Sequence, residues 1–366
     1  MSARLDKLRT IMRANNIDIM ALIPGANLRY LTGGVHYVME RPIVMFIALD
    51  GQPLAVIPKM EIPVFARHSI QSEIISWTDA EGYNDAFRRG LDQLNPQGKT
   101  IGVEGFNMRF AEGEVIRQYA TGATVTGVDE TMAELRIHKD ADEIASLRKA
   151  IDISQQGLQA TLDAVRVGMS EIEVALMLED NLRQLGTEGF AFDTILHAGG
   201  NTALPHMGPL DYRIQAGDPL LIDFGGIVDG YRADITRTVF VGEPKPEFID
   251  FYNVVKSANA KGRESAKAGI TAGSLDVMTK QVLIDAGYEH LIRARTGHGL
   301  GLETHEPPYI VEGNQQVLEA GMVFTIEPGI YDDNRIGVRI EDDVLITENG
   351  AESLTTFTRD VLVVGE

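Results

Sequence analysis

The stretch LLIDFGGIVDGYRADITRT, residues 220–238, decides the fold of this chain. Apolar residues flank the Val228-Asp229-Gly230 turn, a pattern that predicts a β-hairpin. Asp223 and Asp234 lie on its two arms, and their odd separation (234 − 223 = 11) places both side chains on one face if the turn has two residues. Two buried, ionised carboxylates at one place are costly unless a cation neutralises them or one is protonated. The hairpin therefore predicts a cation site or a shared proton.

A second segment resembles the first arm of this hairpin. QAGDPLLIDFGG (215–226) and EAGMVFTIEPGI (319–330) align without a gap, which makes Glu327 the counterpart of Asp223 at an offset of 327 − 223 = 104 residues. Two predicted helices precede each segment. We therefore hypothesise a duplicated helix-helix-hairpin unit, with a chance match of twelve residues as the alternative.

The helices of this region have clear start signals. Asp140 with Glu143, and Ser170 with Glu173, have the spacing of a capping box. Two further helical patterns cover 248–269 and 274–287. Before them, strand-like runs at 17–23, 43–50 and 100–105 are separated by helical patterns, as in an α/β domain. We predict two domains, comprising residues 1–131 and residues 132–366.

Composition excludes several classes of function. The formal net charge of −20, without a long run of Lys and Arg, argues against a nucleic-acid partner. The absence of cysteine excludes disulfides, thiolate nucleophiles and Cys-type zinc sites. We find no apolar run of ~18 residues and no apolar signal core, so we expect no membrane association and a cytoplasmic location.

Three more segments present groups suited to chemistry. VFTIEPGIYDDNRIGVRIEDDV (323–344) has Glu327 and Glu341 on apolar runs, TGHGLGLETHEPP (296–308) presents His298 and His305, and HAGGNTALPHMGP (197–209) contains His206. Four carboxylates and one histidine suit a pair of Mn²⁺, Co²⁺, Fe²⁺ or Zn²⁺ ions. We expect a structural role for His36, His68 and His197, and turn or solvent-facing positions for Asp342 and Asp343, with contact to a metal ligand as the alternative for Asp342.

Taken together, these motifs resemble the metallopeptidase family of methionine aminopeptidase, prolidase and aminopeptidase P. The resemblance covers nearly the whole chain and implies a creatinase/prolidase-like α/β N-terminal domain. It also implies an α+β C-terminal domain with the pita-bread fold, in which duplicated helix-helix-β-hairpin halves surround a curved antiparallel sheet. ANLRYLTG at 26–33 is similar to the N-terminal signature of the prolidase and aminopeptidase P branch. Relatives without metal, such as creatinase, lose ligands that this chain retains.

The resemblance also implies roles for individual residues. Two divalent metal ions would be held by five ligands, namely Asp223, Asp234, His298, Glu327 and Glu341, with Mn²⁺ favoured over Co²⁺ or Zn²⁺. Glu327 would be the general acid/base, and a hydroxide bridging the metals would be the nucleophile. His206 and His305 would bind substrate and assist catalysis, and Arg339 would bind substrate beside Glu341.

For this chain, the resemblance implies a peptidase that hydrolyses the Xaa-Pro bond. The compact length favours a dipeptidase (prolidase) over an aminopeptidase P acting on longer Xaa-Pro peptides. Short proline-containing peptides would be the partners, and a homodimer is expected. In family dimers a partner's loop reaches the cleft, although surface charge explains Glu40 and Arg41 of the MERP loop (39–42) more simply. Hydrolysis of a non-peptide amide and a non-catalytic binding role are the alternatives of other classes.

Overall fold

The chain divides into two compact units, with the division between Arg136 and Ile137. This computed structural model describes residues 3–205 and 207–365. The division comes after helix α6 (Asp129–Arg136) rather than after residue 131, because α6 packs against α1 and α2 of the first unit. Each helix in the described ranges is too short or too polar to cross a membrane.

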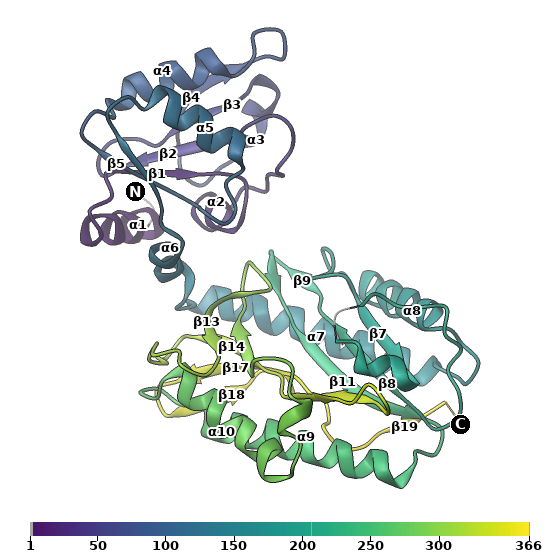
Figure 1. The fold of residues 1–366 in the computed structure, drawn as a ribbon. Coiled ribbons are helices and arrows are strands. Elements are labelled where there is room, and N and C mark those ends of the chain that lie inside the picture. Colours follow the sequence, from purple (N-terminus) through teal and green to yellow (C-terminus); the bar gives the residue numbers. More distant parts are fainter. Residues whose placement is uncertain (1–2, 206, 366) are drawn as a thin grey trace. The chain divides into compact units, whose positions relative to one another are not determined.

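The first unit is the expected α/β domain, built on one six-stranded mixed sheet (Figure 1). In the order β4-β3-β2-β1-β5-β6, its strands are β4 (Glu73–Trp77), β3 (Leu54–Pro58), β2 (Val44–Ala48), β1 (Ile19–Leu22), β5 (Thr100–Val103) and β6 (Thr124–Gly127). Its remaining helices are α1 (Ala3–Ala14), α2 (Ala26–Thr32), η1 (Lys59–Glu61), α3 (Ile62–Phe65), α4 (Asn84–Leu94) and α5 (Phe110–Tyr119). The turn at Asp50-Gly51 joins β2 to its antiparallel neighbour β3, and Gly51 has φ 83°, which favours glycine.

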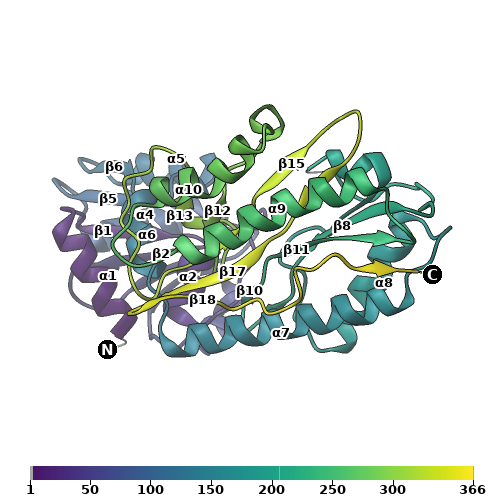
Figure 2. The same cartoon turned by 90° about the horizontal axis from the view of Figure 1, so that it is seen from below.

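The second unit begins with helices whose starts agree with the capping signals. α7 (Ala141–Ala164) and α8 (Glu171–Gln184) begin after Asp140 and Ser170, and each cap forms both bonds of a capping box. The second helix pair is α9 (Pro246–Ser265) and α10 (Ala272–Asp285). Figure 2 shows the strands of this unit lying between the two pairs. The apolar faces of both helix pairs are thereby buried.

Two antiparallel sheets make up most of the strand content of this unit. The first, in the order β19-β11-β8-β7, contains β19 (Val363–Val364), β11 (Ile235–Val241), β8 (Asp218–Phe224) and β7 (Ile195–Ala198), with β19 parallel to β11. The second, in the order β13-β12-β14-β17-β18, contains β13 (Glu306–Ile310), β12 (Gly297–Gly299), β14 (Val323–Ile326), β17 (Asp342–Thr347) and β18 (Gly350–Ser353). The unit also contains short elements outside these two sheets, namely η2 (Gly199–Ala203), β9 (Ile227–Val228), β10 (Tyr231–Arg232), η3 (Glu289–Leu291), β15 (Gly329–Tyr331) and β16 (Gly337–Arg339).

The predicted central hairpin is present in the expected register. Val228 pairs with Tyr231 across Asp229 and Gly230, both of which have positive φ, as a two-residue type I′ turn requires. Further along, Asp223 pairs with Thr236. Because Asp234 lies two residues before Thr236, its side chain points to the same face as that of Asp223.

The two halves of this unit match the duplication hypothesis in order and in detail. Helix pair α7–α8 precedes the β8–β11 hairpin, and helix pair α9–α10 precedes the β14–β17 pair. Gly217 and Gly321, which the alignment makes equivalent, have φ of 87° and 89°. Each glycine turns the chain into the strand that leads to Asp223 or Glu327.

Candidate metal centre

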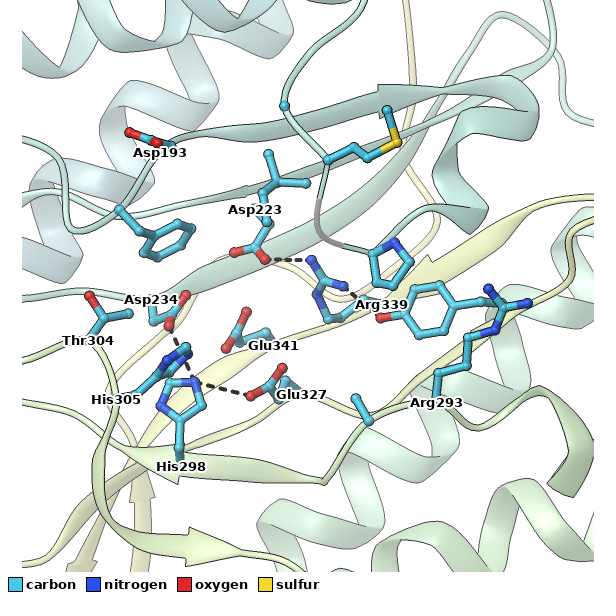
Figure 3. A pocket seen from close by; sticks show the side chains of 17 residues that line it. Asp193, Asp223, Asp234, Arg293, His298, Thr304, His305, Glu327, Arg339 and Glu341 are labelled. Atoms are coloured by element: carbon cyan, nitrogen blue, oxygen red, sulfur yellow. Dashed lines mark hydrogen bonds and ion pairs between the residues drawn. The ribbon is translucent and has the colours of Figure 1, made fainter. Parts of the chain in front are cut away.

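The five predicted ligands converge on one cavity of about 520 Å³ in the second unit. Figure 3 shows their side chains pointing toward one another from strands far apart in the sequence. Asp223 lies on β8, His298 on β12, and the other three lie just outside strand ends. His305, Arg339 and Tyr331 line the same cavity.

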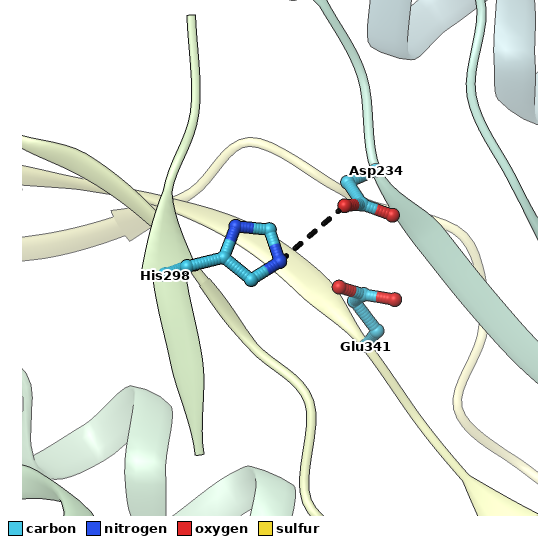
Figure 4. A group of neighbouring side chains, drawn as sticks. All are labelled: Asp234, His298 and Glu341. Atoms are coloured by element: carbon cyan, nitrogen blue, oxygen red, sulfur yellow. Dashed lines mark ion pairs between the residues drawn. The ribbon is translucent and has the colours of Figure 1, made fainter. Parts of the chain in front are cut away.

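Three of the predicted ligands form the tightest group. Asp234, His298 and Glu341 are buried, and one ligand atom from each lies within 4.8 Å of the other two (Figure 4). The Nε2 atom of His298 is 3.6 Å from an Asp234 carboxylate oxygen and 3.2 Å from Oε1 of Glu327. The imidazole therefore faces two carboxylates from different halves of the unit.

Burial and mutual repulsion make these carboxylates hard to ionise without a cation. Burial, followed by the charges of Glu341 and Asp223, raises the pKa of Asp234 well above its usual range. Burial, followed by the charges of Glu327 and Asp223, does the same to the pKa of Glu341. Burial also raises the pKa of Asp223, against the opposing charge of Arg339. The set has the electrostatic character of a site that binds cations.

Glu327 differs from the other carboxylates. Burial alone would raise its pKa, but the hydrogen bond with His298 and the charges of His298 and Arg339 outweigh burial and lower it. The Thr325 hydroxyl also donates to Oε1 of Glu327 at 3.1 Å. The Glu327 carboxyl is thus held ionised and oriented by its neighbours.

The donor set fits divalent ions of hard or borderline character. Carboxylate oxygens and one imidazole nitrogen are the ligands that Mn²⁺, Co²⁺, Fe²⁺ and Zn²⁺ accept in proteins. Among the described residues, buried Oδ1 of Asp223 has no hydrogen-bond partner. A buried carboxylate oxygen without a donor, facing further carboxylates, is explained by a bound cation.

Arg339 is bound to the site by three contacts. Its guanidinium pairs with Asp223, its Nε donates to the Thr236 hydroxyl at 3.0 Å, and its Nη1 donates to the Tyr331 hydroxyl at 2.6 Å. Burial opposes its charge, but the neighbouring Tyr331 and carboxylates raise the pKa of Arg339 well above its usual range. In this arrangement Arg339 orients Asp223, and its expected contact with substrate stays a prediction.

The structure describes one of the two histidines that were predicted to bind substrate. His305 lies edge to face with His298, with ring centroids 4.1 Å apart, and lines the cavity. His206 lies outside the described residues, while Pro205 and Met207 on either side of it line the cavity. The expectation for His206 therefore stays a prediction.

The expectation of solvent-facing positions for Asp342 and Asp343 was wrong. Both side chains are fully buried. Asp342 pairs with Arg237 at 2.8 Å and with Arg359 at 2.7 Å, while Asp343 accepts a hydrogen bond from the backbone N–H of Asp234 at 3.1 Å. Burial raises the pKa of Asp343 well above its usual range. These two residues support the strands behind the ligands.

Thr236 and Tyr331 also contribute to the site but were not singled out from the sequence. Thr236 bonds to Glu341 and Arg339, and Tyr331 bonds to Arg339 and lines the cavity. Strand alternation could have indicated Thr236, because it follows Asp234 by two residues and shares its face. Tyr331 follows Glu327 by four residues but lies on β15, in a different sheet from β14, and no periodicity predicts its position.

Comparisons with known proteins agree with this geometry. Residues 145–348 match the model of metallopeptidase family M24, and residues 4–138 match the creatinase/prolidase N-terminal domain. The chain is 34% identical to the Xaa-Pro dipeptidase of Pyrococcus furiosus over 364 residues, covering 99% of this chain and 100% of that protein. A similar match, 33% identity with 99% of both chains covered, is found to the Xaa-Pro dipeptidase of Pyrococcus horikoshii.

Solved structures give the same picture. A recombinant prolidase from Thermococcus sibiricus superposes with a TM-score of 0.95 at 30% identity and covers 100% of both chains. An X-Pro aminopeptidase from Thermotoga maritima superposes with a TM-score of 0.87 at 31% identity and covers 98% of this chain and 99% of that one. The expected pita-bread fold of the second unit is confirmed by these matches.

Proposed function

The chain belongs to metallopeptidase family M24, and from this membership we propose that it hydrolyses the Xaa-Pro bond of Xaa-Pro dipeptides. The observation that carries the proposal is the convergence of four carboxylates and one imidazole in a single cavity. The chain that forms this cavity matches proteins named Xaa-Pro dipeptidase along 99% of its length. Dipeptides are therefore the first substrates to test.

Asp223, Asp234, His298, Glu327 and Glu341 would hold two divalent ions. Ions bound there would act as Lewis acids on the scissile carbonyl and would lower the pKa of a water molecule, so that it attacks near neutral pH. We favour Mn²⁺, with Co²⁺ and Zn²⁺ as alternatives, because four of the five ligands are carboxylates. Arg339 would keep Asp223 in a ligating orientation.

Glu327 would be the general acid/base. Because its pKa is lowered, the carboxylate is ionised near neutral pH, which a group that accepts a proton from the attacking water requires. The same carboxyl can then deliver that proton to the imino nitrogen of the leaving proline. His305 at the cavity wall, and His206 by sequence resemblance, would donate hydrogen bonds to the oxygen that gains negative charge.

The test is metal replacement with three peptides. The protein is stripped with a chelator, reloaded with Mn²⁺, Co²⁺ or Zn²⁺, and assayed on Met-Pro, Met-Pro-Gly and Met-Ala, with Glu327→Gln as the control. Metal-dependent cleavage of Met-Pro alone supports the dipeptidase. Cleavage of Met-Pro-Gly would favour the second candidate, an X-Pro aminopeptidase, which the Thermotoga structure makes reasonable. Inactivity with every metal, despite bound ions, would refute both.

A further inference from the structure

A buried carboxylate outside the metal centre organises one wall of the cavity. Glu171, the first residue of α8, is fully buried. Its Oε1 accepts hydrogen bonds from the backbone N–H of Ala198 at 2.7 Å and from the side-chain amide of Asn201 at 2.9 Å. Its Oε2 accepts one from the backbone N–H of Leu210 at 2.8 Å. One carboxylate thus ties together both ends of the segment between Ala198 and Leu210.

His197, directly before this segment, adds a second tie to it. Its Nε2 lies 2.8 Å from the carbonyl oxygen of Met207, and its Nδ1 lies 3.4 Å from Oε2 of Glu171. Both partners are acceptors, so each ring nitrogen that carries a proton donates to one of them. The imidazole is fully buried between the carboxylate and the carbonyl. It connects Glu171 directly to the part of the segment that faces the cavity.

The segment itself has little regular structure to hold it in place. After η2, the described residues 204–205 and 207–210 belong to no helix or strand, yet Pro205, Met207 and Gly208 line the cavity. Further hydrogen bonds reach it from the second half of the unit: the Thr202 hydroxyl accepts one from the N–H of Gly337 at 2.9 Å, and the carbonyl oxygen of Ala203 accepts one from Nη1 of Arg293 at 3.4 Å. A loop that lacks its own ladder of hydrogen bonds depends on such side-chain contacts for its position.

We propose that Glu171 and His197 are positioning residues that fix this cavity wall, formed by residues 199–205 and 207–210, for substrate binding. Neither of the two lines the cavity, so both act through the segment that they hold. The part of this inference that concerns substrate rests on the proposed function. The part that concerns the wall does not.

The charge state of Glu171 agrees with this role. Burial alone would raise the pKa of its carboxyl, but hydrogen bonds from His197, Asn201 and the two backbone N–H groups outweigh burial and lower it. A glutamine in its place would keep the shape but would point N–H groups at existing donors. Glu171→Gln is therefore a precise way to release the wall without opening a cavity.

The experiment compares Glu171→Gln and His197→Asn with Glu173→Gln in the full chain. Glu173 lies two residues further along α8, caps the same helix through Ser170, and pairs with Arg213 on the surface. Hydrogen exchange of residues 198–210 is measured without substrate, with exchange in α8 and β8 as internal references. Metal uptake and kcat/KM on Met-Pro are measured on the same samples. Asn201→Ala, which removes one donor only, serves as a milder variant if Glu171→Gln does not fold.

We expect exchange in 198–210 to rise about tenfold and kcat/KM to fall at least about tenfold in Glu171→Gln and His197→Asn. Metal uptake should not change, because the five ligands lie on other segments. Glu173→Gln should match the wild type in all three measurements, and Asn201→Ala should change exchange and kcat/KM in the same direction by less. Wild-type exchange in Glu171→Gln, or equal changes in Glu173→Gln, would overturn the positioning role. If the wild-type chain is inactive on Xaa-Pro peptides, the proposed function is refuted instead. Hydrogen exchange of residues 198–210 would still test whether Glu171 and His197 hold the wall in place.

Discussion

Thr236 and Glu341 are joined by two hydrogen bonds that connect the two halves of the metal-binding unit. The backbone N–H of Glu341 donates to the carbonyl oxygen of Thr236 at 3.1 Å, and the Thr236 hydroxyl donates to Oε2 of Glu341 at 2.6 Å. The same hydroxyl accepts a hydrogen bond from Arg339. Thr236 thereby fixes the orientation of a proposed ligand and of the arginine that holds another.

Replacing Thr236 tests this link. Thr236→Val keeps the shape but leaves Nε of Arg339 and one oxygen of Glu341 without their partner, so we expect metal affinity or kcat/KM to fall about 10–100-fold. Thr236→Ser retains the hydroxyl and should remain within about threefold of wild type. Calorimetric metal titration and assays on Met-Pro measure the two effects. Equal behaviour of the valine and serine variants would show that the hydroxyl does not orient the ligands.

Much of the site could be predicted from local sequence patterns. The two-residue turn at Asp229-Gly230 fixes the register of the hairpin, and that register places Asp223 and Asp234 on one face. The capping boxes at Asp140 and Ser170 fix the starts of α7 and α8. Turns and caps depend on neighbouring residues, so one sequence is enough to recognise them.

The remaining features depend on contacts between residues far apart in the chain. Asp342 is buried because Arg237, 105 residues earlier, donates to it, and no local pattern contains that pairing. The position of Arg339 is likewise hidden from local patterns. Its guanidinium pairs with Asp223, which lies 116 residues earlier. The same reasoning applies to Glu171. Its local sequence indicates a carboxylate at the start of a helix, but it accepts hydrogen bonds from residues 27 to 39 positions later. Side-chain partners of this kind become visible only in the folded chain.

The metal-free protein should lose stability as the pH rises. The pKa of Glu341 is raised well above its usual value, so its contribution is fully present below about pH 4 and is lost as the pH rises through the folded-state pKa. Glu341→Gln removes this group. In the presence of a chelator, we expect the Tm of the wild type to fall relative to that of Glu341→Gln by several °C between pH 5 and pH 8, since 1 kcal/mol corresponds to about 2–4 °C in a unit of this size.

Adding Mn²⁺ should reverse this difference. The metal binds ionised ligands and stabilises the wild type most at high pH, whereas Glu341→Gln lacks one ligand. Differential scanning calorimetry with and without Mn²⁺ at both pH values measures all four combinations. A constant Tm difference between the two proteins across the pH range would contradict the raised pKa of Glu341.

The first unit should be sensitive to acid through a buried histidine pair. Nε2 of His36 lies 2.8 Å from Nε2 of His68, and burial, followed by the charge of His36, lowers the pKa of His68 to about 4. The pKa of His36 is lowered by burial as well, against the nearby Glu61. Above pH ~6.5 both folded and unfolded histidines are neutral, whereas below it the unfolded chain binds protons that the folded unit does not. Stability should therefore fall as the pH drops from about 6.5 to 4.

Trp77 allows this loss to be measured in the first unit alone. It is the one tryptophan of the chain and is buried in the core of that unit. We expect its fluorescence-detected Tm to drop between pH 6.5 and 4, and to drop by at least about 2 °C less in His68→Asn. Identical acid dependence of the two proteins would show that His68 is not responsible.

A buried ion pair beside His305 gives the strongest expected effect on stability. The ammonium of Lys139 lies 2.7 Å from Oε1 of Glu306, and both side chains are almost completely buried. Lys139→Met would leave the Glu306 carboxylate without this cation, so we expect the free energy of unfolding to fall by about 3–5 kcal/mol. Glu306 directly follows His305 in the chain, so kcat/KM should fall as well.

Arg148→Met, which breaks a half-exposed pair with Glu352, is the matched control and should cost at most about 1 kcal/mol. Replacing both partners, in Lys139→Met with Glu306→Leu, should restore most of the stability, because the loss comes from burying a carboxylate without its ammonium rather than from missing attraction. Urea denaturation followed by circular dichroism measures all of these variants, and a cost for Lys139→Met no larger than that for Arg148→Met would show that the buried pair contributes no more than a half-exposed one.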